Sequence, residues 1–149
     1  MDIEIRTVDA PAEDDPIYRD ALSVRTDVFV EEQGVPAEIE VDEHESTATH
    51  FVAYDDGAAI GTARLREPEE STGKVERLAV RAEYRDDGVG TTLMERVEAA
   101  AREREFERLR LHSQVGAAPF YASLGYERVG DQFEEAGIPH VEMRKSLGG

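Results

Sequence analysis

The spacing of apolar residues changes several times along this chain, and the order of these changes is the strongest constraint on its fold. From His50 to Val80 the residues follow a strand-like pattern, with a turn at Asp55-Asp56-Gly57. Residues 88–104 instead place their apolar side chains on one face of a helix. A strand pattern, a short helix and a last strand pattern follow. We therefore expect a mixed α/β fold built in layers.

Local signals give approximate bounds for each expected element. We expect strands over 3–8, 51–54, 59–65, 75–80, 109–111 and 141–143, helices over 16–29, 88–104 and 117–124, and a polar loop over 66–74. Residues 31–47 are acidic and irregular, which fits either a disordered loop or a functional one. No repeat or linker divides the 149 residues, so we expect a single domain over 1–149.

Cysteine is absent from the sequence. Its absence excludes disulfides, thiolate zinc sites and a cysteine nucleophile, and it makes the cytoplasm the expected location. The first residues carry no signal-peptide pattern, and the apolar runs are far shorter than the ~20 residues that cross a bilayer. The four histidines are not spaced like metal ligands, so we expect no metal.

The charge balance narrows the range of partners. Asp and Glu total 34 against 17 Lys and Arg, for a formal net charge of −17. Such a chain should repel nucleic acid and anionic membranes, which are bound chiefly through Lys and Arg. Only Lys74 and Lys145 are lysines. An acid-rich, lysine-poor composition resembles that of proteins from salt-accumulating organisms, so we expect a halophilic protein; the alternative is an ordinary acidic domain.

One turn carries a chemical signal. The strand pattern Val75–Val80 leads into Arg85-Asp86-Asp87-Gly88-Val89-Gly90-Thr91, which opens the long helix. The first amides of a helix have no partners inside it, so this turn can bind an anion. A dinucleotide-binding fingerprint would need glycine where Leu93 stands, and a Walker A loop would need Gly-Lys-Ser/Thr, so both are excluded. On its own, the turn also fits an ordinary strand–helix connection.

Together with a second segment, the turn resembles the acetyl-CoA-binding motif of the GNAT superfamily of N-acetyltransferases. That segment is Pro119-Phe120-Tyr121-Ala122-Ser123-Leu124-Gly125-Tyr126. The resemblance implies a mostly antiparallel mixed sheet, splayed at the cofactor site, with helices on both faces. It implies acetyl-CoA as co-substrate, with the backbone of Leu78 and Val80 pairing with the pantetheine arm. The pyrophosphate would be held by the turn residues Arg85, Asp86, Asp87, Gly88, Val89, Gly90 and Thr91.

The same resemblance makes Tyr121 the acid that protonates the leaving thiolate. A phenol, with a pKa near ~10, can donate to a thiolate whose parent thiol has a pKa near ~8.5. The competing interpretation is a core aromatic residue beside Phe120.

The amino-terminal third resembles the ElaA-like subgroup of predicted acyltransferases. The resemblance is carried by residues 25–36, by Leu111-His112-Ser113-Gln114 and by residues 133–140. Ala37 and Glu45 depart from the subgroup, which leaves the substrate preference open. Candidate acceptor-side residues are Arg25, Glu32, Gln33, His50 and His112. The carboxylates of Glu32, Glu40, Asp42 and Glu45 could line a pocket for a cationic amine, with His50 or a carboxylate relaying its proton. The alternative is that each of them is a solvated surface charge, since acidic residues are abundant throughout the chain.

The expected function is transfer of an acetyl group from acetyl-CoA to an amine by direct attack in a ternary complex. The acceptor would be a small molecule or a peptide, and the chain would be able to form a homodimer. The alternative is a non-catalytic module that senses acyl-CoA; such a module can lose its acid, whereas this chain keeps Tyr121.

Overall fold

The computed structural model describes residues 2–36 and 42–148. In this described part of the chain, seven strands form one sheet in the order β1-β2-β3-β4-β5-β7-β6. The strands are β1 (Ile3–Asp9), β2 (Thr49–Asp55), β3 (Ala58–Glu69), β4 (Thr72–Val80), β5 (Arg108–Gln114), β6 (Glu127–Glu135) and β7 (Ile138–Ser146). The α-helices are α1 (Pro16–Arg25), α3 (Val89–Glu103) and α4 (Ala118–Ser123), and Thr26–Glu32 continues α1 as a π-helix, η1.

Contacts divide the chain into two compact units. Unit 1 comprises Met1–Arg66 and Arg77–Val97, and unit 2 comprises Glu67–Glu76 and Glu98–Gly149. Strands β3 and β4 contribute residues to both units. In neither unit is a described helix long and apolar enough to cross a membrane.

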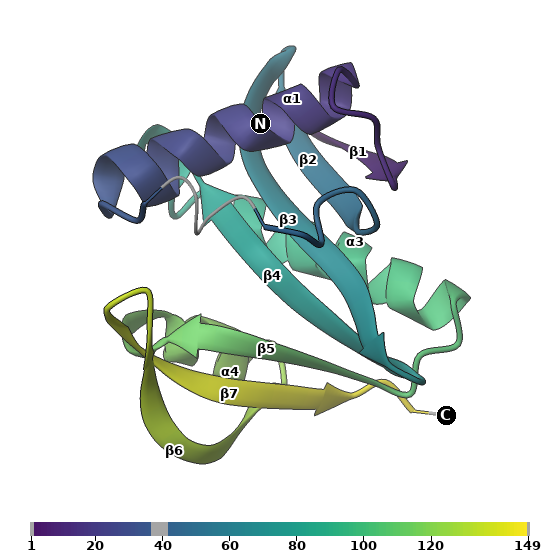
Figure 1. Cartoon of the computed structure of the whole chain (residues 1–149), viewed down its shortest axis with the longest axis vertical. Helices are drawn as coiled ribbons and strands as arrows, with labels where there is room; N and C mark the ends of the chain where they lie inside the picture. Colours follow the sequence, from purple (N-terminus) through teal and green to yellow (C-terminus); the bar gives the residue numbers. More distant parts are fainter. Residues whose placement is uncertain (1, 37–41, 149) are drawn as a thin grey trace. The chain divides into compact units, whose positions relative to one another are not determined.

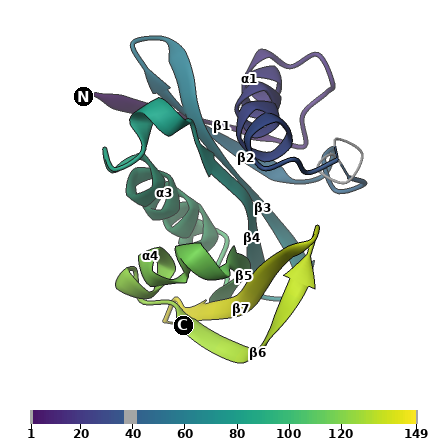
Figure 2. The same ribbon diagram turned by 90° about the vertical axis from the view of Figure 1, so that its left-hand side faces the viewer.

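In unit 1, two helices cover opposite faces of the strands. Figure 2 shows α1 on one side of β1–β4 and α3 on the other. Strands β1, β2 and β3 pair antiparallel, and the expected turn is confirmed, with Asp56 and Gly57 both at positive φ. At Gly61 on β3, an added Cβ would lie 2.9 Å from Val89 and 3.0 Å from Leu93, so the glycine allows α3 to pack closely on the sheet.

Helix α1 begins where the sequence places its start. The Asp15 side chain accepts hydrogen bonds from the amides of Ile17 and Tyr18, at 2.9 and 3.2 Å, and Pro16 occupies the first helical position. The expected single helix changes to π geometry at Thr26 and continues to Glu32. The spacing of apolar residues predicts which face of the helix is buried, but it does not distinguish a π-helical turn from an α-helical one.

In unit 2, β5 pairs antiparallel with β7, and β7 with β6 (Figure 1). The first half of β4 pairs parallel with β5, from Thr72–Arg108 to Val75–Leu111, where the ladder ends. Short helix α4 ends before Gly125, whose φ of +97° confirms the expected left-handed stop.

One expectation about the strands is wrong, and one strand is missing from the prediction. The polar loop over 66–74 is replaced by a short turn at Glu70 and Ser71, with Ser71 at a φ of +61°. Strand β6 is not predicted, because all of its side chains except the half-buried Phe133 are exposed. An exposed, charged edge strand carries no alternating apolar signal.

Candidate active site

The turn between β4 and α3 presents backbone donors. At the start of α3, the Thr92 amide donates a hydrogen bond to the Gly88 carbonyl at 3.0 Å. Among the described residues, the amides of residues 86–91 donate no hydrogen bond. Gly88 has a φ of +82°, and apart from its chain neighbours no described residue has an atom within 4 Å of the position where its Cβ would be. The turn therefore offers open space and unpaired donors, as an anion site requires.

Arg85 is held by unit 1 itself. Its two Nη atoms donate to the carboxylate of Glu32 at 2.6 and 2.7 Å, and its Nε donates to the Val80 carbonyl at 3.0 Å. The hydrogen bond from Arg85 lowers the pKa of the Glu32 carboxyl group. The structure thus joins a residue expected on the acceptor side, Glu32, to a residue expected at the cofactor turn.

Strand β4 has an irregularity just before the two residues expected to pair with pantetheine. Arg77 has a φ of +56°, and the ladder with β5 has already ended at Val75. Leu78 and Val80 are half-buried, and the Val80 carbonyl is the group that Arg85 binds. In this conformation one of the expected backbone acceptors is therefore occupied.

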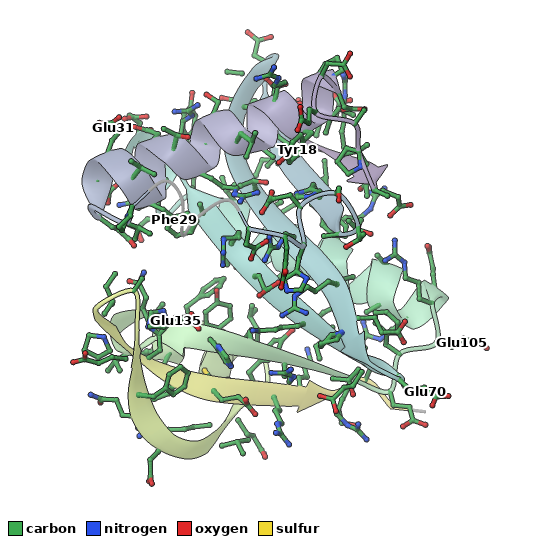
Figure 3. The ribbon with its side chains drawn as sticks, viewed as in Figure 1. Tyr18, Phe29, Glu31, Glu70, Glu105 and Glu135 are labelled. Carbon is green, nitrogen blue, oxygen red and sulfur yellow. The ribbon has the colours of Figure 1, made fainter. Side chains whose placement is uncertain are left out.

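A buried ion cluster lies between α1, the segment before β2, and β3. The Glu45 carboxylate accepts two hydrogen bonds from Arg25, both 2.8 Å, and further ones from Arg64 and from the Tyr18 hydroxyl. Tyr18 lies on α1 (Figure 3). Burial alone would raise the pKa of Glu45, but the two arginines outweigh it and lower that pKa. The cluster stabilises the packing of α1 within unit 1.

His50 is part of this cluster. Its ring is fully buried, and Nε2 donates to the Glu45 carbonyl at 2.9 Å. Burial lowers the pKa of His50, so the ring stays neutral. Arg25 is also buried, with 1% of its surface exposed. Enclosed in this way, neither side chain is placed to touch an acceptor.

The expected carboxylate pocket is not what the structure shows. Asp42 pairs with Arg64 and Arg77, Glu45 pairs with Arg25 and Arg64, and Glu32 pairs with Arg85. The fourth carboxylate, Glu40, lies outside the described residues. Gln33 directly follows η1 and is exposed.

In unit 2, Tyr121 lies on α4 among aromatic rings. Its ring centroid is 5.0 Å from that of Phe120 and 6.0 Å from that of Tyr126, both edge-to-face. It is 8% exposed, and among the described residues its hydroxyl has no hydrogen-bond partner. Burial raises the pKa of the phenol, so Tyr121 keeps its proton.

The end of α4 is fixed by a lysine. Lys145 Nζ donates to the Leu124 carbonyl at 2.7 Å and to Glu98 at 2.8 Å. Glu98 also accepts from the Tyr126 hydroxyl at 3.0 Å. Because Tyr126 packs on Tyr121, these bonds hold the surroundings of Tyr121 in place.

His112 lies on β5 in a second polar cluster of unit 2. Its Nδ1 is 3.0 Å from Glu135, labelled near the end of β6 in Figure 3, and its Nε2 is 3.6 Å from Glu142. His140 Nε2 is 3.7 Å from the other Glu135 oxygen. Sequence reasoning selected His112 but missed Glu135 and His140, although both belong to the segment that resembles the ElaA-like subgroup. Within residues 2–36 and 42–148, no group of three or more acidic or histidine side chains is arranged to hold a metal ion.

Comparison with known proteins defines the class. The model of the acetyltransferase (GNAT) domain matches residues 12–147. The chain therefore belongs to the GNAT acetyltransferase family, and its mixed α/β fold is the one that the sequence resemblance predicted.

Individual relatives agree with this assignment. The chain is 40% identical over 135 residues to YjcF of Bacillus subtilis, an uncharacterized N-acetyltransferase, which covers 90% of this chain and 96% of YjcF. The crystal structure of an acyl-CoA N-acyltransferase from Pseudomonas aeruginosa matches with a TM-score of 0.83 and 28% identity, covering 97% of this chain and 99% of that one. Escherichia coli ElaA matches with a TM-score of 0.84, covering 96% and 99% of the two chains, and at 23% identity it shows the fold alone.

Proposed function

We propose that this protein transfers an acetyl group from acetyl-CoA to the amine of a small molecule or peptide, by direct attack in a ternary complex. The observation that carries the proposal is the set of unpaired amides at residues 86–91, beside the open space at Gly88. This donor set fits a pyrophosphate, because an oxyanion accepts several backbone N–H bonds at once. Acetyl-CoA would supply an activated thioester.

The residues of the turn, of β4 and of α4 would each have a separate role in this reaction. The amides of the turn would orient the pyrophosphate, and the backbone of Leu78 would pair with the pantetheine arm. Tyr121 would protonate the departing sulfur. The desolvation that raises the pKa of this phenol also raises that of a thiol in the same surroundings, which keeps the proton transfer feasible.

The cofactor assignment predicts a thermal shift. Acetyl-CoA at 100 times its dissociation constant should stabilise the protein by about 2.7 kcal/mol. For a domain of this size the midpoint should rise by roughly 5–10 °C. Gly88→Asn should remove most of this rise, because asparagine tolerates positive φ and places a side chain in the open space that the phosphates would use. Thermal melts with and without acetyl-CoA, at fixed salt, make the measurement.

Gly57→Asn is the matched control. Gly57 has a φ of +83° and is equally open, but it lies in the β2–β3 turn, so this variant should keep the full shift. ATP should produce a much smaller shift, since it has no pantetheine arm. An undiminished shift in Gly88→Asn, or an equal shift with ATP, would refute the cofactor assignment.

We also propose a cytoplasmic, salt-adapted setting, supported by the net charge of −17. Self-repulsion should destabilise the folded protein when salt is dilute, and screening should relieve it. The midpoint of thermal unfolding should therefore rise between about 0.1 M and about 2 M KCl. A midpoint that is flat or falls over this series would contradict the halophilic interpretation.

A further inference from the structure

The polar cluster around His112 is arranged to accept a proton. A neutral imidazole has one N–H and one lone pair, and the partner of the N–H decides which nitrogen is basic. Glu135 lies 3.0 Å from Nδ1 of His112, and the hydrogen bond between them lowers the pKa of the Glu135 carboxyl group. A carboxylate only accepts, so Nδ1 of His112 donates and the lone pair lies on Nε2.

His112 also occupies a distinctive place in unit 2. The parallel ladder between β4 and β5 ends at the pair Val75–Leu111, and His112 is the next residue of β5. It is half-buried, with 21% of its side chain exposed, so Nε2 is not sealed off from solvent. Phe133 fixes the ring by an edge-to-face contact at 5.0 Å.

Carboxylates lie near both ring nitrogens of His112. Glu142 lies 3.6 Å from Nε2, but its charge is shared with Arg144 at 2.7 Å and Arg110 at 3.7 Å. Glu135 faces His112 and His140, and Lys74 on β4 acts on it at longer range. Glu135 is therefore the carboxylate within hydrogen-bond distance of the His112 ring, and Glu142 lies beyond that distance.

His140 repeats the same arrangement. Its Nδ1 donates to the Ile138 carbonyl at 2.7 Å, so its lone pair lies on Nε2, facing Glu135 at 3.7 Å. The Phe133 ring stacks on it with centroids 6.1 Å apart. Glu135 thus lies near two imidazole rings that both carry the N–H on Nδ1 and the lone pair on Nε2.

We propose that His112, oriented by Glu135, is the general base that deprotonates the acceptor ammonium. This inference rests on the proposed function. Nε2 of His112 takes one proton from the ammonium, which frees the nitrogen lone pair; the nitrogen–carbon bond forms and the carbon–sulfur bond breaks. Tyr121 protonates the departing sulfur and becomes a phenolate. The second proton then leaves the nitrogen and returns to Tyr121, and His112 releases its own proton to solvent. Glu135 is a positioning residue.

The test compares pH profiles of acetyl transfer. Wild type is first offered acetyl-CoA with a panel of primary amines: an alkyl diamine, an amino-acid ester and a peptide with a free amino terminus, with thiol release as readout. With the acceptor that reacts fastest, His112→Gln should lower kcat/KM by ~10²–10⁴-fold near neutral pH. The deficit should shrink as the pH approaches the pKa of the amine, because free amine then no longer needs a base. A structural lesion would lower the rate equally at every pH.

Glu135→Gln tests the positioning role. It should lower kcat/KM by a smaller factor than the ~10²–10⁴-fold expected for His112→Gln, because the base remains and only its orientation and tautomer are no longer fixed. Glu134→Gln is the matched control, because the exposed neighbour on β6 should leave the rate unchanged. Melts of each variant, with and without acetyl-CoA, identify any variant that fails to fold.

The outcomes separate the two proposals. A His112→Gln profile parallel to that of wild type overturns the base assignment while transfer itself stands. A Glu135→Gln rate equal to that of Glu134→Gln overturns the positioning role. If wild type binds acetyl-CoA and acetylates no amine of the panel, the sensor alternative holds and both the proposed function and the base assignment fall.

Discussion

Replacing Glu45 by glutamine is expected to lower the free energy of unfolding by about 3–5 kcal/mol. The carboxylate binds Arg25 with two hydrogen bonds of 2.8 Å, and Arg25 is 1% exposed. Without the negative charge, the buried Arg25 guanidinium would lose the charged partner of two short hydrogen bonds, which is far less favourable than losing an exposed ion pair. Urea unfolding at pH 7, with a check that the slope is unchanged, makes the measurement.

Glu43→Gln is the control for this substitution. The Glu43 side chain is 86% exposed and lies 3.8 Å from His44, so its loss should change stability by less than about 0.5 kcal/mol. If Glu45→Gln is no less stable than Glu43→Gln, the cluster does not stabilise the fold.

The same cluster predicts instability in acid. Unfolded, His50 binds a proton below a pH of about 6.5; folded, it resists protonation because burial lowers its pKa. The unfolded state therefore binds more protons. As the pH is lowered, the free energy of unfolding decreases by at most ~1.4 kcal/mol per pH unit for this group. Glu45, whose pKa is also lowered, adds a loss at still lower pH. The pH slope between about 5 and 7 should be smaller in His50→Gln than in His44→Gln.

Replacing Tyr121 by phenylalanine is expected to lower kcat by ~10²–10⁴-fold, the contribution typical of a general acid. Acetyl-CoA affinity should be nearly unchanged, since the ring and its contacts with Phe120 and Tyr126 remain. Stability should also change little, because the lost hydroxyl has no hydrogen-bond partner in the described chain. Steady-state kinetics with the best amine of the panel, together with the thermal shift, make the comparison.

Tyr126→Phe is the matched control, because it removes the hydroxyl from the neighbouring ring. It breaks the 3.0 Å hydrogen bond to Glu98, so stability should fall by about 1–3 kcal/mol, while kcat should fall far less than in Tyr121→Phe because the proton donor remains. If the two variants show equal turnover, Tyr121 is a core residue and the acid is elsewhere.

Much of the fold follows from local physics. A glycine turn between an apolar strand and an amphipathic stretch predicts β4, the turn and α3, because backbone freedom and apolar period are properties of neighbouring residues. The end of α4 at Gly125 was predicted for the same reason. Strand β6 was not predicted because its backbone hydrogen bonds to β7 define it, and Phe133 is its only partly buried side chain.

The candidate site also has features that follow from the local sequence and features that depend on the tertiary structure. The sequence alone determined that the turn at residues 85–91 presents helix-start amides, because those donors are unpaired in any helix. Only the tertiary structure decided which carboxylates are neutralised: Glu45 meets Arg25 across 20 residues, and Glu32 meets Arg85 across 53. In a chain with 34 acidic residues, composition does not specify such partners. Likewise, Glu135 meets His112 only because β5, β7 and β6 pair side by side, which places distant side chains on one face of the sheet.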